Sequence, residues 1–162
     1  MRIARILSVM AVSTALAIAG AQLSAAEMSA NFAGTWKFNA SRGENLGMMA
    51  SIQQTQVIQQ TATEMSISES SDFQGQKSSR TVRFDLTGAP ANNEGPMGGQ
   101  AVTVAKWEGA ALVVTWTTPG SVAGTVNVRT ETRILSEDGR TMTLRSQRGA
   151  QAKPMTQVFE KQ

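Results

Sequence analysis

The chain has 162 residues, carries 15 Lys and Arg against 12 Asp and Glu, and contains no Cys, His or Tyr. A chain of this length suggests one domain. The missing Cys and His exclude disulfide frameworks, thiol nucleophiles, His-based acid–base catalysis and zinc sites built on those ligands. The formal charge of +3 indicates an anionic partner only if the basic residues belong to the mature domain.

The first 26 residues have the pattern of a secretory signal peptide. Arg2 and Arg5 precede an apolar run that is too short and Ala-rich for a membrane span, and small residues at Ser24 and Ala26 suit signal peptidase. We expect cleavage after Ala26, although a cut after Ala25 would suit almost as well, and a mature domain over 27–162. Without Arg2 and Arg5 the mature chain keeps 13 basic against 12 acidic residues, so its charge is near +1.

From Phe32 onward, apolar residues alternate with polar ones at a period of two, which predicts half-buried β-strands. Val82, Phe84 and Leu86 alternate with Thr81, Arg83 and Asp85, for example. Later, Val126, Val128, Thr130, Thr132 and Ile134 share one face, which we expect to be buried, opposite Asn127, Arg129, Glu131 and Arg133. The predicted strands are 33–39, 52–59, 62–69, 78–86, 100–107, 111–118, 123–136, 140–147 and 154–161.

Turn residues separate these strands at short intervals. Asp138-Gly139 is the strongest hairpin signal, because a tight turn needs a positive φ that Gly adopts without steric cost. Two stretches lack alternation. We expect a short helical turn or an irregular plug over 40–50, and a long mobile loop over 87–99.

The fold class predicted is all-β: an antiparallel up-and-down meander closed into an eight- to nine-stranded barrel. Closure removes the two exposed edges that an open meander would leave. A membrane barrel would need an apolar outer band and aromatic girdles. The chain offers charged outer faces (Arg83, Asp85, Arg129, Glu131, Arg133, Arg145), with three Trp, five Phe and no Tyr, so we expect it not to span a membrane.

The opening Gly34-Thr35-Trp36 after Phe32, together with Lys106-Trp107-Glu108-Gly109 and the closing Phe159-Glu160-Lys161-Gln162, resembles the calycin superfamily of lipocalins and fatty-acid-binding proteins. The whole mature chain is most similar to uncharacterised exported bacterial lipocalin-like proteins. This resemblance implies a periplasmic or secreted location. It also implies that Gly34 and Trp36 close one end of the barrel, with Trp36 covered by Arg133 or Arg145 in a cation–π pairing.

The sequence departs from fatty-acid-binding proteins at two places. Their last strand carries an Arg and a Tyr that hold the ligand carboxylate by charge-assisted hydrogen bonds, whereas the matching positions here are Gln157 and Phe159. The span from Trp36 to Ile52 is too short for their two-helix lid. We therefore do not expect a carboxylate clamp of that kind.

No pattern in the sequence supports catalysis, a metal site or a cofactor. The Ser residues have no His to activate them, and the adjacent pair Glu137-Asp138 lies at a hairpin tip. Arg129, Arg133, Arg140, Arg145 and Arg148 could share an outer face, but exposed aromatics that would accompany nucleic-acid binding are missing. We expect no nucleic-acid partner.

The leading hypothesis is a monomeric, non-catalytic binding protein for a small, largely apolar ligand held inside the barrel. The interior stripe mixes medium-sized apolar side chains with hydroxyls, which would leave space and polar contacts. The expected lining residues are Phe84, Val102, Val104, Val114, Trp116, Val128, Thr130, Met142, Leu144 and Phe159. The alternative is a solid barrel that binds an envelope partner through the 87–99 loop or the Arg-rich face.

Overall fold

The computed structural model describes residues 29–96 and 98–162, so the predicted signal peptide lies outside the described residues. Ten antiparallel strands make up the fold, together with two short 3-10 segments. The strands are β1 (Gly34–Phe38), β2 (Gln53–Gln60), β3 (Glu64–Phe73), β4 (Gln76–Asp85), β5 (Ala91–Glu94), β6 (Gln100–Glu108), β7 (Ala111–Pro119), β8 (Val126–Leu135), β9 (Thr141–Arg148) and β10 (Met155–Lys161).

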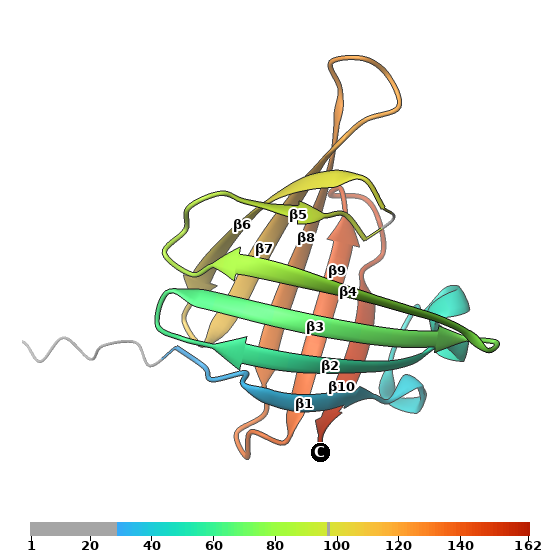
Figure 1. Ribbon diagram of the computed structural model, residues 1–162, viewed down its shortest axis with the longest axis vertical. Coiled ribbons are helices and arrows are strands. Elements are labelled where there is room, and N and C mark those ends of the chain that lie inside the picture. Colours follow the sequence, from blue (N-terminus) through green and yellow to red (C-terminus); the bar gives the residue numbers. More distant parts are fainter. Residues whose placement is uncertain (1–28, 97) are drawn as a thin grey trace, which may run out of the picture.

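The strands form one sheet in the order β4-β3-β2-β1-β10-β9-β8-β7-β6-β5. Consecutive strands pair with each other, except that β4 and β5 form the two ends of the order, and β1 pairs with β10. The predicted meander is therefore confirmed. In Figure 1 the first four strands cross β6–β10 at a steep angle, which makes a nearly closed barrel of two crossed layers. The strand number was underestimated, because β5 lies inside the predicted loop and its Ala-Asn-Asn-Glu sequence has no apolar alternation.

The two edge strands of the sheet, β4 and β5, are joined by a side chain rather than by a strand ladder. Asn93 Nδ2 donates to the Arg83 carbonyl at 2.8 Å, and Asn93 Oδ1 accepts from the Arg83 backbone N–H at 2.8 Å. The same Nδ2 donates to Thr103 Oγ1 at 2.8 Å. The amide of Asn93 thus replaces a peptide group and brings the edges of the barrel together.

The segment between β1 and β2 covers one end of the barrel. It holds two 3-10 segments, η1 (Ala40–Arg42) and η2 (Gly47–Ser51), in agreement with the short helical turn predicted there. The hairpin between β7 and β8 projects outward beyond the barrel wall (Figure 1). Within residues 29–96 and 98–162, no helix is long and apolar enough to cross a membrane.

Trp36 lies in the buried core where the first and last strands pair, and neither Arg133 nor Arg145 covers it. Trp36 is fully buried, its Nε1 donates to the Phe32 carbonyl at 2.8 Å, and Lys161 Nζ lies 5.3 Å from its ring centroid. Lys161 covers it because the first and last strands pair directly, with Trp36 opposite Lys161. Gly34 has a φ of +136°, and a Cβ there would lie 2.8 Å from Lys161 Cε.

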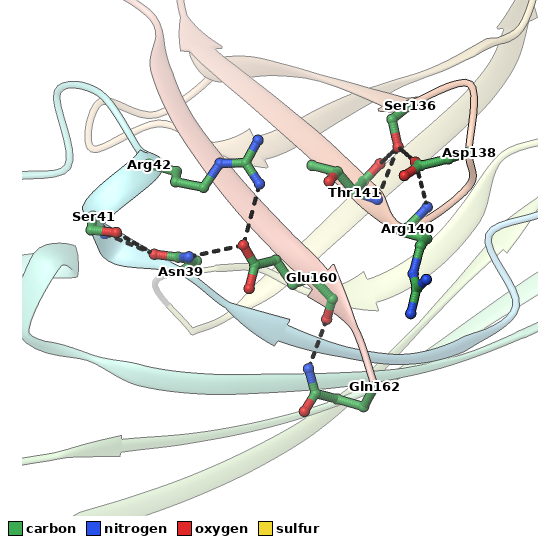
Figure 2. Close-up of polar contacts among 9 residues, drawn as sticks. All are labelled: Asn39, Ser41, Arg42, Ser136, Asp138, Arg140, Thr141, Glu160 and Gln162. Carbon is green, nitrogen blue, oxygen red and sulfur yellow. Dashed lines mark hydrogen bonds and ion pairs between the residues drawn. The ribbon is translucent and has the colours of Figure 1, made fainter.

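Figure 2 shows the polar contacts of two exposed segments, the β8–β9 turn and the segment that follows β1. At the β8–β9 turn, Ser136 Oγ donates to Asp138 Oδ1 at 2.6 Å, and the Arg140 backbone N–H donates to the same oxygen. Gly139 has a φ of +66°, so the predicted Asp138-Gly139 hairpin is confirmed. After β1, Asn39 and Arg42 both donate to Glu160 on β10.

Candidate functional site

The barrel encloses a cavity of about 620 Å³. It reaches the surface between η2 and the β5–β6 loop, and its lining includes Val82 and Leu144 of the packed core. Apolar side chains line the mouth: Leu46, Met48, Met49, Ile52, Pro96 and Met155. The deeper wall is polar and charged, with Gln54, Gln56, Glu69, Arg80, Arg129, Glu131, Arg133 and Gln157 among its residues.

The strand register explains why the interior becomes more polar toward the mouth. On β2, β3 and β4, directly paired inward residues form rows. The deepest row is Ile58, Ile67 and Val82, the next is Gln56, Glu69 and Arg80, and the row nearest the mouth is Gln54, Ser71 and Ser78. Paired residues point to one face of a sheet, so each row stays at one depth and the cavity lies in the two polar rows.

A continuous ionic network crosses the cavity wall from β8 to β4. The carboxylate of Glu131 pairs with Arg129 through one oxygen and lies 3.7 Å from Arg133 Nη2 through the other. Arg133 Nη1 donates to Gln56 Oε1 at 3.2 Å, and Gln56 Nε2 donates to Glu69 Oε2 at 3.4 Å. Arg80 Nη2 completes the network at 3.3 Å from the same oxygen.

Trp116 lies next to this network on β7. It is opposite Arg129 in the strand register, and the Arg129 guanidinium carbon is 5.5 Å from the indole centroid. Phe84 packs edge-on against the indole, with ring centroids 5.7 Å apart. This stacking fixes the indole, so its Nε1 has a defined direction.

Burial acts strongly on the cationic side chains of the network. Burial lowers the pKa of Arg133 and of Arg129, and in each case the charge of Glu131 opposes that shift. A guanidinium nevertheless stays charged in proteins. The cavity wall therefore keeps permanent positive charge in a region of low polarity.

The described residues of the cavity wall have an excess of unpartnered hydrogen-bond donors. Among the described residues, the buried side-chain polar atoms without a partner are Arg80 Nη1, Arg129 Nε, Arg133 Nε and Trp116 Nε1. All four are N–H donors, and all four residues line the cavity. Buried donors without partners are costly, so the site is suited to a group rich in hydrogen-bond acceptors.

Six of the ten expected interior residues are buried inside the barrel: Phe84, Val114, Trp116, Met142, Leu144 and Phe159. Of these, Trp116 and Leu144 line the cavity, and the others pack in the core. The remaining four, Val102, Val104, Val128 and Thr130, lie on the outer face. Val102 is 42% and Val128 46% exposed, so these four cannot contact a ligand inside the barrel.

The face prediction for β8 was wrong because the charged side of this strand points inward. Arg129, Glu131 and Arg133 pair with Trp116, Val114 and Leu112 on the inner face of β7. Mutual ion pairing makes their burial possible, so the apolar Val/Thr side is left outside. Arg129 and Arg133 are therefore absent from the expected basic outer face, on which Arg145 is exposed.

On β6 the inward residues are the small Ala101, Thr103 and Ala105 rather than the two valines. Trp107 determines which side of β6 faces inward. Its ring stacks on Phe32 with centroids 6.1 Å apart, and residues two positions apart on a strand point to the same side. Glu69 and Arg80 also line the cavity, although they were not among the residues predicted from the sequence. In the sequence, the feature that could have identified these two residues is that their charges lie at positions in register with Gln56.

The cavity wall does not resemble a metal site. Residues 29–96 and 98–162 contain no group of three or more Asp or Glu side chains placed to hold a metal ion. The buried Glu131 is engaged by Arg129 and Arg133, and the partly buried Glu69 by Arg80. The charged side chains of the wall can supply electrostatic and hydrogen-bonding contacts to a ligand.

Comparison with known proteins supports the fold but no sequence family. No family model matches the chain, and no curated protein matches it by sequence. Among solved structures, it is similar to apo Caenorhabditis elegans lipid binding protein 8, with 14% identity, a TM-score of 0.64, and coverage of 83% of this chain and 99% of that one. A fatty acid transporter named REP1-NXSQ has 17% identity and a TM-score of 0.61, covering 80% and 95%. Echinococcus granulosus fatty-acid-binding protein 1 has 12% identity and a TM-score of 0.60, covering 80% and 96%.

These similarities show that the barrel fold of the chain is similar to that of solved fatty-acid-binding and lipid-binding proteins. The expected architecture is therefore confirmed at the level of fold.

Proposed function

We propose that this protein binds, without chemical conversion, a small amphipathic molecule with an apolar body and an acidic head group. The observation that carries the proposal is the set of four unpartnered N–H donors around one cavity. An anionic oxygen group accepts several such bonds at once, and charge-assisted bonds are the strongest of them. The printed names of the structural neighbours, which concern fatty acids and lipids, agree with this ligand class.

The cavity also defines how the ligand is oriented. The acidic group lies deep, against Arg129, Arg133 and Trp116, while the apolar body extends to the mouth. There Leu46, Met49 and Met155 offer partly or fully buried apolar surface. This site uses β4, β7 and β8, whereas Gln157 on β10 bonds Gln54 at 3.3 Å, so it differs from the last-strand clamp.

Calorimetric titration with decanoate and decan-1-ol tests the proposal, since the two share a chain length and differ in the head group. We expect decanoate to bind in a one-to-one complex and decan-1-ol to bind at least about ten-fold more weakly, because a hydrogen bond to a charged group contributes about 1.5–3 kcal/mol. Equal affinities, or no binding of either compound, would overturn the proposal.

A pair of variants locates the site. Arg129→Met removes one cavity guanidinium, and Arg145→Met removes the same charge from the outer face of the adjacent strand. We expect the first variant to lose about ten-fold in decanoate affinity and the second to bind as the unmodified protein does. Equal losses would indicate attraction by overall charge rather than by the cavity.

We further propose export of the mature chain as a monomer to the periplasm or the cell exterior. The basic start, apolar run and small residues of the first 26 positions support export. N-terminal sequencing of the protein recovered from the host's extracytoplasmic fraction tests it, with Glu27 as the expected first residue. The alternative of a solid barrel is disfavoured by the cavity volume.

A further inference from the structure

We propose that Glu131 limits the ligand's head group to a single negative charge. This inference rests on the proposed function, because it concerns the charge of a head group in the same cavity. It goes beyond that function by naming the residue that sets the charge and the class of acid that is excluded. The argument starts from the charges that line the cavity.

Four arginines and three glutamates line the cavity: Arg80, Arg129, Arg133, Arg148, Glu69, Glu94 and Glu131. Their formal charge is therefore +1. The exposed Glu94 and Arg148 lie at the mouth, where solvent weakens their influence. Without this opposed pair the deep wall still carries +1, so one negative charge on the ligand makes the buried region neutral.

The excess charge lies on β8. On the opposite wall Arg80 and Glu69 form one pair. On β8, by contrast, the single carboxylate of Glu131 forms ion pairs with both Arg129 and Arg133. One of these two arginines is therefore always without its own counter-ion, and both keep an unpartnered Nε. A singly charged acid supplies the missing counter-ion.

A doubly charged head group does not suit this wall. Its second charge would have no cation of its own in the deep cavity, and it would lie near the buried Glu131 carboxylate, which is 5% exposed. An unpaired charge in a region of low polarity is strongly unfavourable. The cavity should thus accept carboxylates, sulfonates and sulfates, and should exclude phosphate monoesters in their dianionic form.

A phosphate monoester provides a direct test on the unmodified protein, since its second pKa is about 6. Decyl phosphate is a monoanion at pH 5 and mostly a dianion at pH 8, whereas decane-1-sulfonate is a monoanion at both. The chain has no His and no Cys, the side chains whose ordinary pKa values would place a titration of the protein in or near this range. The pH change therefore acts chiefly on the ligand.

We expect decyl phosphate to bind about ten-fold more tightly at pH 5 than at pH 8, and decane-1-sulfonate to bind equally at both. If the phosphate binds as well at pH 8 as at pH 5 while the sulfonate binds at both, the inference fails and the proposed function stands. If neither compound binds at either pH, the proposed function itself fails.

Glu131→Gln then tests the assigned residue, because it removes the charge and keeps the shape. We expect this variant to bind dianionic decyl phosphate at pH 8 at least as well as the monoanion at pH 5. The matched control is Glu108→Gln at the exposed end of β6, which should keep the preference for the monoanion. An unchanged preference in Glu131→Gln, confirmed as folded by circular dichroism, would overturn the role of Glu131.

Discussion

The side-chain amide of Asn93 is hydrogen-bonded to both backbone groups of Arg83, at 2.8 Å each. These two residues lie on β5 and β4, the two ends of the ten-stranded sheet order. An Asn side chain carries the same donor and acceptor as a peptide group. One residue thus replaces part of the ladder that would otherwise close the barrel.

Asn93→Ala should destabilise the protein by about 1–3 kcal/mol, because the peptide groups of Arg83 lose their partners. Hydrogen exchange at the Arg83 amide should accelerate at the same time. Urea unfolding and exchange mass spectrometry measure the two effects. The neighbouring Asn92→Ala is the control, since Asn92 is exposed and should change neither; equal effects in both variants would contradict the assigned role.

Glu131→Ala should cost about 3–5 kcal/mol in unfolding free energy, since it leaves two buried guanidinium groups without their carboxylate. The triple variant Arg129→Met, Glu131→Leu, Arg133→Met removes all the charges together. We expect the triple variant to be about as stable as the unmodified protein, because apolar replacement of a buried ionic triad is often neutral.

The triple variant should nevertheless lose measurable affinity for decanoate. Thermal unfolding and calorimetric titration on the same samples separate the two properties. Retained decanoate binding by the triple variant would show that the network stabilises the fold without recognising the ligand.

Gly34→Ala should destabilise the protein by about 1–3 kcal/mol, because a side chain is strained at its φ of +136°. The close Lys161 Cε belongs to a flexible side chain that can move aside, so adding Lys161→Ala should recover little of the loss. Lys161→Ala alone should cost about 0.5–1 kcal/mol through its contact with Trp36. Urea unfolding of the three variants checks this, and full recovery in the double variant would show that steric contact dominates.

Acid stability should depend on the β8–β9 turn. Hydrogen bonds from Ser136 and from the Arg140 backbone lower the pKa of Asp138 below its ordinary value of 3.8. The contribution of the ionised carboxylate is therefore complete above pH 3.8 and is lost as the pH falls through the lower folded pKa. Asp138→Asn should flatten this part of the pH profile of the unfolding free energy, and a parallel profile would contradict the assignment.

The strands could be predicted because alternation depends on local residue order. Nine of the ten strands overlap predicted ranges that differ from them by at most a few residues at the ends. The short β5 could not be predicted, because its residues have no apolar period and its pairing depends on β6. The bounds of β8 were extended too far for a similar reason, since Gly124 belongs to the projecting loop.

The site was harder to predict than the strands because hydropathy does not decide which side of a strand faces inward. On β8 the predicted alternation was right and the predicted face was wrong, because three charged residues that form ion pairs with one another occupy the interior. Arg133 donates to Gln56 on β2, and Gln56 donates to Glu69 on β3; both strands lie far away in the sequence. No local pattern contains that information.

The rows of paired residues divide the barrel interior into an apolar floor and a polar upper half. Trp36, Phe84 and Phe159 are buried in the apolar core, and the middle row belongs to the ionic network. The row nearest the mouth, Gln54, Ser71 and Ser78, carries no charge. These three positions are thus comparatively free to change during evolution, and a laboratory library confined to them could retarget the cavity to other acids without first restabilising the scaffold.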